Sequence, residues 1–316
     1  MRANDYCLIL AAGFGTRMGE IGKHLPKVMW PVFHKSLLEV QVLFARSLGY
    51  EKIYINIHHQ ADIILGMTKD NHNFKNVVWL KEDPDILDIG GGIHNLAQQS
   101  EINYQGRLLV LNADQLLWFT RSDLQPWLSA LENHDAILLS LMVNSSQGYN
   151  QLVLEKSILK EIKPNKEIHP PQDILTYTGN ALINLNTLKR ASGVSKFFES
   201  VCSFDRKNLC VNVSRHPYWD FGTKERYFES LKRIVREIKV AELEEFYHFL
   251  ESSEIFRSDL ADPELVSYNS RQPESFNLTL DGVIENGTKG VLIAGHKLGS
   301  NGRVAFGYKE ITDYLK

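Results

Sequence analysis

Apolar runs alternate with amphipathic stretches along the first two-thirds of the chain. The runs are rich in Ile, Val and Leu, as expected for strands that are covered on both faces of a sheet. Between them, apolar positions recur every three or four residues, which is typical of helices. This alternation predicts an α/β fold with a Rossmann-like, mostly parallel sheet flanked by helices. The strands are predicted at residues 7–12, 52–57, 77–80, 108–111 and 136–142.

The helix between the first two predicted strands has a clear start signal. Ser36 and Glu39 have the spacing of a capping box, in which the Ser side chain accepts a hydrogen bond from the Glu backbone. Leu38, Val42 and Ala45 then fall on one helical face. We expect this helix to return the chain to the second strand of the sheet.

The pattern changes past residue 151. "QLVLEKSILKEIK" (151–163) and "TYTGNALINL" (176–185) predict hairpin-like pieces. Insertions of this kind carry function on a rigid α/β core, so we expect a lip around a sugar-sized pocket there.

A second change of pattern follows at about residue 240. "AELEEFYHFLESSE" continues helically, and Leu292, Leu298 and Val304 then recur every six residues. This recurrence predicts a short left-handed β-helix, and the alternative is a small β appendage packed on its own domain. The predicted domains are 1–240 for the α/β core and 241–316 for a helical linker with a β-rich C-terminal extension.

Composition narrows the class of protein. The 316 residues are 43% hydrophobic and 23% charged, with a net charge of −3. These values predict a folded protein with small-molecule partners. The net charge gives no basic surface for nucleic acid, and the sequence contains no apolar run long enough to span a membrane. Three cysteines, an odd number, and an N-terminal "MRANDYC" without a secretory apolar core argue against a secreted disulfide framework, so we expect a cytoplasmic protein.

The first candidate for chemistry is "LILAAGFGTRM" (8–18), an apolar strand that leads into glycines and an arginine. Gly13 and Gly15 suit a backbone that approaches a phosphate closely, and the alternative is a plain tight turn. A dinucleotide fingerprint is disfavoured, because Gly19 falls one residue late and no acidic residue closes the second predicted strand.

Charged residues at three other places complete the candidate chemistry. Lys27 follows Pro26 and could neutralise phosphate charge, or it could be an ordinary surface lysine. Asp114 in "LNAD" lies at the carboxyl end of a predicted strand, where open α/β sheets bind ligands. Asp220 in "WDFGTKER" could hold a hard cation with Asp114, since Mg²⁺ takes one or two carboxylates, or it could cap a helix.

Taken in order, these motifs resemble those of the sugar-1-phosphate nucleotidylyltransferases. "LAAGFGTRM" followed by "PK" is similar to the signature loop of that family, and "DIGGGI" (88–93) to its base-side glycine segment. "LNAD" and "WDFGTKER" resemble its two metal-aspartate motifs, so the resemblance covers about residues 7–235. Within the family, the chain is most similar to the mannose- and heptose-1-phosphate guanylyltransferases and the N-acetylmuramate-1-phosphate uridylyltransferases.

The resemblance implies an enzyme that transfers a nucleotidyl group from a nucleoside triphosphate to a sugar 1-phosphate and releases pyrophosphate. It implies that Arg17 holds the β and γ phosphates, and that Lys27 lies against the α-phosphate and the sugar phosphate. The implied cofactor is Mg²⁺, held by Asp114 and Asp220. The other implied positions are Ala12, Gly13, Gly15, Thr16, Asp83, Gly90 and Gly91 at the nucleotide and Lys163, Gly179 and Asn180 at the sugar phosphate.

The substrates stay open between alternatives. A carboxylate at Asp83 could accept both N1–H and the exocyclic amine of guanine but only N3–H of uracil, which favours GTP with mannose- or heptose-1-phosphate. The alternative is a UTP-dependent N-acetylmuramate- or hexose-1-phosphate uridylyltransferase. Ile162 stands before Lys163 where many relatives have glutamate, so recognition of the sugar hydroxyls is open.

Two other classes of protein remain as alternatives to this enzyme. One is a nucleotide-sugar-binding regulatory subunit without catalysis. The other is a glycosyltransferase, which is disfavoured because "NAD" has asparagine at the first position of a DxD pair. The resemblance also suggests assembly into a homo-oligomer through the C-terminal extension.

Overall fold

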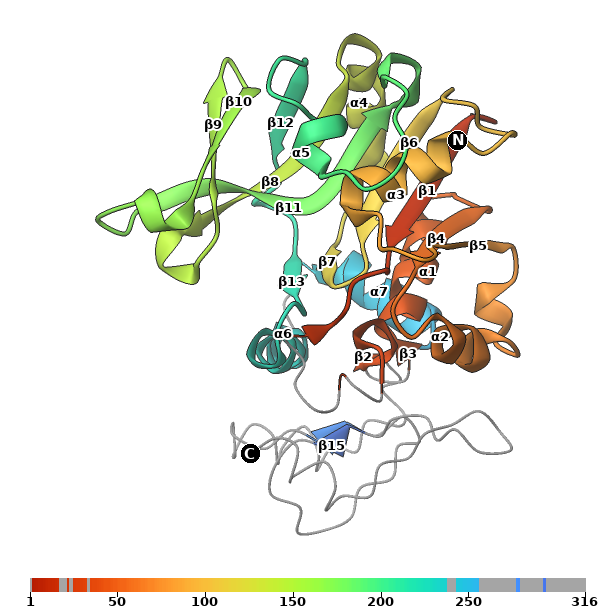
Figure 1. The fold of residues 1–316 in the computed structure, drawn as a ribbon. Helices are drawn as coiled ribbons and strands as arrows, with labels where there is room; N and C mark the ends of the chain where they lie inside the picture. Colours follow the sequence, from red (N-terminus) through yellow and green to blue (C-terminus); the bar gives the residue numbers. More distant parts are fainter. Residues whose placement is uncertain are drawn as a thin grey trace. The chain divides into compact units, whose positions relative to one another are not determined.

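The computed structural model describes residues 2–16, 22, 25–32, 35–237, 243–255, 277–278 and 292–293 (Figure 1). By its contacts the chain divides into two compact units. The first unit comprises Met1–Gly13, Ala45–His58 and Asn76–Tyr218, and the second comprises Phe14–Phe44, His59–Lys75 and Trp219–Lys316. Across the described residues, no helix is long and apolar enough to cross a membrane.

The first unit is built on a mixed sheet of nine described strands in the order β5-β4-β1-β6-β11-β8-β12-β10-β9. Strands β5, β4, β1 and β6 are parallel to one another, β11 is antiparallel to both its neighbours, and β12 is parallel to β8. The strands are β1 (Asp5–Leu10), β4 (Ile53–Ile57), β5 (Val77–Lys81), β6 (Arg107–Asn112), β8 (Ala136–Asn144), β9 (Gln151–Glu155), β10 (Ile158–Lys163), β11 (Asp173–Asn184) and β12 (Asn208–Asn212).

The predicted fold class, a mostly parallel sheet flanked by helices, is confirmed. All five strands predicted from apolar runs are present as β1, β4, β5, β6 and β8. The hairpin predicted at residues 151–163 is present as the antiparallel pair β9–β10. The prediction of a second hairpin-like piece at residues 176–185 was wrong, because residues 176–184 belong to the single strand β11, which lies in the middle of the sheet between β6 and β8. Leu185 begins a short 3-10 helix.

The helix predicted after Ser36 is α1 (Leu37–Ser47). The Ser36 hydroxyl accepts a hydrogen bond from the Glu39 backbone N–H at 3.2 Å, as the capping spacing predicts. The Glu39 carboxylate accepts a hydrogen bond from the Asn73 side chain at 2.8 Å and pairs with Lys35 at 3.3 Å. The other helices are α2 (Ala61–Thr68), α3 (Asp88–Ala97), α4 (Arg121–Ala130), α5 (Phe197–Ser200), α6 (Lys224–Glu237) and α7 (Glu244–Ser252).

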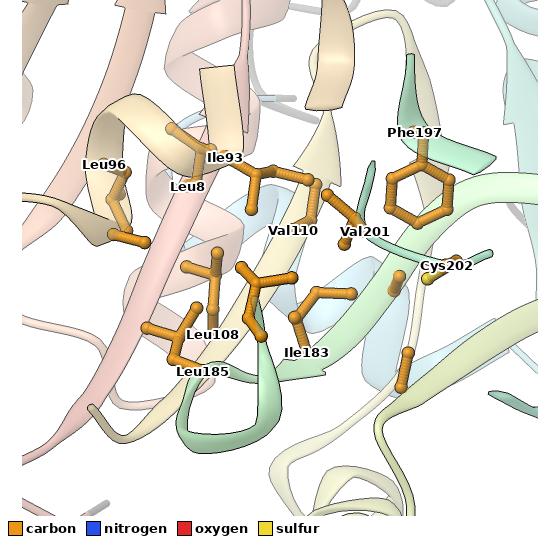
Figure 2. Packing of buried hydrophobic residues seen from close by; sticks show 14 of the residues in the cluster. Leu8, Ile93, Leu96, Leu108, Val110, Ile183, Leu185, Phe197, Val201 and Cys202 are labelled. Atoms are coloured by element: carbon orange, nitrogen blue, oxygen red, sulfur yellow. The ribbon is translucent and has the colours of Figure 1, made fainter. Parts of the chain in front are cut away.

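A hydrophobic core lies between the sheet of the first unit and helices α3 and α5 (Figure 2). Leu8, Leu108 and Val110 from the central strands meet Ile93 and Leu96 from α3, while Phe197 and Val201 extend the same cluster at α5. Burial of this apolar surface fixes the sheet beneath α3, and with it the strand ends that carry the candidate site.

Aromatic rings pack together within the second unit. Trp219 stacks on Phe246 with ring centroids 4.4 Å apart, and Trp30 meets Tyr227 edge-on at 5.1 Å. The unit also contains a short 3-10 helix at Lys27–Met29 and the strand pair β2 (Pro31–Val32) and β3 (Lys35–Ser36).

The predicted C-terminal β-helix falls almost wholly outside the described residues. Of that region, β14 (Asn277–Leu278) pairs in parallel with β15 (Leu292–Ile293). Leu298 and Val304 lie outside the described residues.

Candidate active site

The order of the first strands creates a switch point at the carboxyl ends of β1 and β6. From β1 the chain adds β4 and then β5 on one side, and it later places β6 on the other side. Leu10 lies opposite Asn112, and the Ala113 N–H donates to the Leu10 carbonyl at 3.1 Å. In open α/β sheets, ligands bind at such a point. The predicted residues Ala12, Gly13 and Asp114 therefore follow the two strand ends where a ligand is expected.

A bulge in β11 supports the turn that carries Asp114. The register of β11 against β8 shifts between Tyr177 and Ala181, and Gly179 within this bulge has φ of +82°. Asn180 is 1% exposed, and its side-chain oxygen accepts a hydrogen bond from the Asn112 backbone N–H at 3.0 Å. The structure thus places Asn180 beneath the Asp114 turn, and its predicted contact with the sugar phosphate stays a prediction.

Gly179 has a packing reason to be glycine. A Cβ atom there would overlap Gln115 Oε1 and would lie 2.9 Å from Asn112 Nδ2. These two side chains are joined by a hydrogen bond of 3.4 Å across the Asp114 turn. The absence of a side chain at residue 179 therefore lets the amide pair close over the bulge.

The predicted base-side glycines lie in the first turns of α3. A Cβ atom at Gly90 would lie 2.5 Å from Ser200 Oγ and 2.6 Å from the Lys196 carbonyl. A Cβ atom at Gly91 would overlap the Gly193 carbonyl oxygen. Close packing of residues 193–200 against α3 therefore requires these glycines, and their role at the nucleotide stays a prediction. Asp83, in the connection before α3, is exposed.

A buried pair beside these elements, Asn56 and Glu82, was missed by the motif analysis. Each side chain is 3% exposed, and the Asn56 amide donates to Glu82 Oε1 at 2.7 Å. Asn56 Oδ1 accepts from the Ala11 N–H at 2.8 Å, while Glu82 Oε2 accepts from the Leu87 N–H at 2.8 Å. The available signal was a polar residue within an otherwise apolar β4 and an acid directly after β5.

The second unit contains the rest of the predicted signature loop. Gly15 has φ of +61°, and a Cβ atom there would lie 3.5 Å from Lys27 Cβ, so the loop and the predicted lysine are neighbours. Lys27 begins the short 3-10 helix and is half-buried, whereas Thr16 is exposed. Arg17 lies outside the described residues.

Asp220 ends β13 (Tyr218–Asp220) and is 8% exposed. Its Oδ1 accepts from the Gly222 N–H at 2.6 Å, and its Oδ2 pairs with the Arg226 guanidinium at 2.8 Å. The capping alternative for Asp220 is filled by Thr223, whose hydroxyl accepts from the Arg226 backbone N–H at 3.3 Å. The Asp220 carboxylate is thus held in one orientation by two contacts.

The chemistry of Asp114 and Asp220 suits Mg²⁺. Carboxylate oxygens are hard donors, and Mg²⁺ needs only one or two of them when phosphates and water supply the other positions. Among the described residues, no group of three or more His, Cys, Asp or Glu side chains is arranged to hold a metal ion.

Lys163, predicted at the sugar phosphate, is the last residue of β10 and lies opposite Gln151. It is half-buried. Ile162, where the resemblance predicts a glutamate, packs against the hydrophobic core of the first unit, and Glu161 is exposed. Pleating places these neighbours on opposite faces, so Glu161 does not substitute for a glutamate at residue 162.

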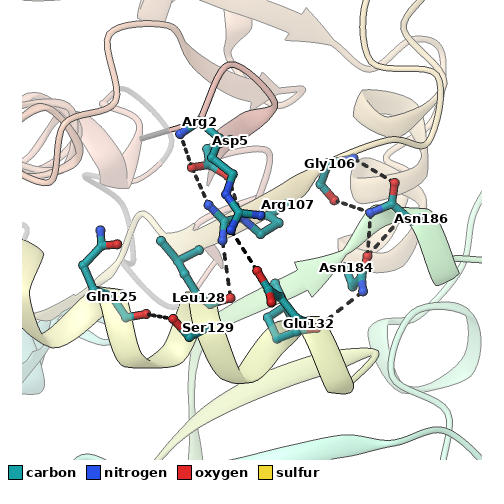
Figure 3. Close-up of polar contacts among 11 residues, drawn as sticks. Arg2, Asp5, Gly106, Arg107, Gln125, Leu128, Ser129, Glu132, Asn184 and Asn186 are labelled. Carbon is teal, nitrogen blue, oxygen red and sulfur yellow. Dashed lines mark hydrogen bonds and ion pairs between the residues drawn. The ribbon is translucent and has the colours of Figure 1, made fainter.

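The amino end of the sheet carries a separate polar hollow of about 460 Å³. Its charges are already paired, because Arg107 binds both oxygens of Asp5 at 2.7 and 2.8 Å, and Arg2 pairs with Glu132 at 2.8 Å (Figure 3). The buried Asp5 carboxylate at this end of the sheet therefore offers a comparison with the carboxylates of the candidate site.

The fold and the strand-end site define an open α/β protein with a topological switch point at the carboxyl ends of β1 and β6, where ligands bind in such sheets. A family model described as the MobA-like NTP transferase domain matches residues 7–197. The chain belongs to this family. The predicted resemblance to nucleotidylyltransferases is confirmed at this level.

Individual relatives agree with the family. "Bifunctional protein GlmU" from Marinobacter nauticus is 26% identical over 294 residues, which cover 87% of this chain and 60% of that protein. The UTP–glucose-1-phosphate uridylyltransferase of Synechocystis sp. is 30% identical over 118 residues, or 35% of this chain and 30% of that protein. The chain thus spans 60% or less of the length of these curated relatives.

Solved structures show the same fold. The crystal structure of HddC from Yersinia pseudotuberculosis has a TM-score of 0.62 at 18% identity and covers 73% of this chain and 99% of its own. The same protein complexed with GMP-PN has a TM-score of 0.60 at 19% identity, with the same coverage of both chains.

Proposed function

We propose that the chain transfers a nucleotidyl group from a nucleoside triphosphate to a sugar 1-phosphate. The observation that carries this proposal is the pairing of Leu10 with Asn112. It brings the start of the glycine loop and the turn that carries Asp114 to the switch point of the sheet, where ligands bind. Membership of an NTP transferase family supports the same reaction class.

The proposed chemistry needs no protein nucleophile. An oxygen of the sugar phosphate attacks the α-phosphorus of the triphosphate, the bond to the β-phosphate breaks, and pyrophosphate leaves with the electron pair. The attacking phosphate is already an anion at neutral pH, so positioning and charge neutralisation carry the rate.

The predicted charged residues and loop glycines have distinct roles in this proposal. Gly13 and Gly15 let the loop approach the triphosphate, Arg17 holds its β and γ phosphates, and Lys27 neutralises charge at the α-phosphate. Asp114 and Asp220 hold Mg²⁺, which supplies further charge neutralisation on the phosphates. Lys163 and the Gly179–Asn180 bulge serve the sugar-phosphate side.

We further propose GTP as the nucleotide and mannose- or heptose-1-phosphate as the acceptor. The support is Asp83, an exposed carboxylate in the connection that enters α3. It could accept two hydrogen bonds from guanine but only one from uracil. A UTP-dependent uridylyltransferase is the second candidate, which the curated relative from Synechocystis sp. favours by its name. Homo-oligomerisation through residues 241–316 and residence in the cytoplasm stay predictions.

The decisive experiment measures pyrophosphate release for four nucleoside triphosphates crossed with a panel of sugar 1-phosphates in the presence of Mg²⁺. We expect the highest kcat/KM with GTP, and we expect Asp83→Asn to reduce the preference for GTP over UTP by at least about tenfold, because an amide cannot accept at both positions. Asp85→Asn, an exposed change in the same connection, is the matched control and should leave the preference unchanged.

Other outcomes of this experiment would overturn specific parts of the proposal. A preference for UTP that survives Asp83→Asn would refute the guanine argument and support the uridylyltransferase. Failure of every pair to release pyrophosphate, with a nucleotide-sugar still bound, would support the regulatory subunit.

A further inference from the structure

A chain of three hydrogen bonds connects two segments that are predicted to meet the nucleotide. It runs from the Ala11 N–H to Asn56, from Asn56 to Glu82, and from Glu82 to the Leu87 N–H. The first end lies directly before Ala12 and Gly13, and the second lies directly before α3 with Gly90 and Gly91. All four members belong to the first unit.

The ends of this chain explain why one member is a carboxylate. Both ends are backbone N–H donors, so the two side chains between them must together accept at both ends and still bond to each other. An amide can accept at one end and donate at the other, whereas a carboxylate accepts at both. Asn56 followed by Glu82 satisfies all three bonds, and two amides would leave one pair of donors facing each other.

Burial of the Glu82 carboxylate costs free energy, so we expect the hydrogen bonds that it accepts to have a role beyond packing. Glu82 is 3% exposed, and within the part of the chain that the structure describes no lysine, arginine or histidine forms an ion pair with it. A buried charge without a cation is unfavourable compared with an apolar side chain. A Cβ atom at Gly92 would lie 2.9 Å from Asn56 Nδ2 and 3.1 Å from Glu82 Oε1, so α3 packs directly onto the pair.

We propose that Asn56 and Glu82 are positioning residues that hold the start of the glycine loop and the start of α3 in the geometry that binds the nucleoside triphosphate. This inference rests on the proposed function, because it assigns the two segments to the nucleotide. Neither side chain touches the substrate. The bridge acts through the backbone of Ala11 and Leu87, so it governs nucleotide affinity rather than affinity for the sugar phosphate.

The test uses one disruptive variant and one that restores the hydrogen bonds with reversed polarity. Glu82→Gln places two donors against each other at one of the three bonds, whichever way the amides turn. Adding Asn56→Asp makes residue 56 the double acceptor, so that residue 82 donates to it and still accepts from the Leu87 N–H. The double variant therefore satisfies all three bonds again.

We expect Glu82→Gln to raise the KM and the Kd for the nucleoside triphosphate about tenfold, which corresponds to about 1.4 kcal/mol. The KM for the sugar 1-phosphate should change less than about twofold, since about 0.4 kcal/mol separates values that differ by that factor. The double variant should return the nucleotide KM to within about threefold of the wild-type value.

The matched control changes a buried carboxylate at the amino end of β1, whereas the bridge binds Ala11 just past the carboxyl end of this strand. Asp5 is 1% exposed at its side chain and binds Arg107 at the amino end of β1 (Figure 3). Asp5→Asn should lower the free energy of unfolding while leaving both KM values unchanged. A role for Glu82 in stability alone would give the same result in Glu82→Gln and would overturn the proposal, as would equal rises in both KM values or a double variant without rescue.

Amide hydrogen exchange in the ligand-free protein separates this inference from the proposed function. Glu82→Gln should speed exchange at residues 11–13, at residues 86–90 or at both, and the double variant should restore protection wherever it was lost. If the wild-type protein neither binds nor turns over a nucleotide, the proposed function fails, and exchange alone decides the bridge. Unchanged exchange at both segments in Glu82→Gln would then refute it.

Discussion

Replacement of Gly179 by alanine tests whether the β11 bulge supports the Asp114 turn. The backbone at Gly179 has φ of +82°, a conformation that costs an alanine about 1–2 kcal/mol. The added Cβ atom would also overlap Gln115 Oε1 and approach Asn112 Nδ2 to 2.9 Å. Overpacking of this kind costs about 1–3 kcal/mol, so we expect Gly179→Ala to lower the free energy of unfolding by about 2–5 kcal/mol.

Gly148→Ala provides a control with the same backbone strain and no collision. Gly148 has φ of +83°, and nothing lies within 4 Å of a Cβ atom there. The control should therefore lose only the backbone cost of about 1–2 kcal/mol. Urea unfolding followed by circular dichroism gives both values, and their difference isolates the collision with the amide pair.

The activity of the two variants extends the same test to the site. Displacement of Gln115 and Asn112 would move the Asp114 turn, and a shift of about 1 Å at a reacting group can cost about 100-fold in rate. Gly179→Ala should lose most of its kcat for pyrophosphate release, while Gly148→Ala keeps it. Equal losses of stability in the two variants, or full activity of Gly179→Ala, would show that the bulge does not support the turn.

Two further predictions follow from single side chains. Asp114→Ala and Asp220→Ala should each lower kcat about 10³-fold with unchanged circular dichroism, whereas Asp173→Ala, at the exposed start of β11, should not; near wild-type turnover at saturating Mg²⁺ would exclude that aspartate as a ligand. Burial lowers the pKa of His94 in the folded protein. As the pH falls below about 6.5, the unfolded chain therefore binds a proton that the folded chain does not. The free energy of unfolding then decreases as the pH falls, by up to about 1.4 kcal/mol per pH unit. His94→Gln should flatten that slope between about pH 7 and 5 in urea unfolding, and an identical slope would contradict the assignment.

The strands that the sequence predicts most directly are the central ones of the parallel part of the sheet, which are largely buried. Runs of Ile, Val and Leu mark β1, β4 and β6 without any knowledge of their neighbours. β11 was misread, because "TYTGN" combines polar residues with a glycine, which locally favours a turn. In the folded chain the glycine forms a bulge within one strand, and pairing with β6 and β8 overrides the local preference.

The candidate site was predictable where its residues follow one another in the chain. Gly15 and Lys27 belong to one motif, and the structure brings them together. Sequence motifs, however, give positions and not contacts. Asn180, which was predicted at the sugar phosphate, is buried beneath the Asp114 turn. A glycine motif also cannot show whether the missing side chain makes room for a ligand or for protein, and residues 193–200, which pack on Gly90 and Gly91, are far along the chain.

Three acidic residues illustrate what decides the role of a carboxylate after a strand. Glu82, Asp114 and Asp220 all follow or end strands, so the sequence pattern treats them alike. Glu82 is buried between a side-chain amide and a backbone N–H, which makes it an acceptor for the protein itself. Asp220 accepts from the Gly222 N–H and pairs with the cation of Arg226, and these two contacts orient its carboxylate. Both carboxylates have two described donors, but the donors to Glu82 are neutral amides whereas one donor to Asp220 is a cation. This difference in the charge of the donors cannot be read from the order of residues.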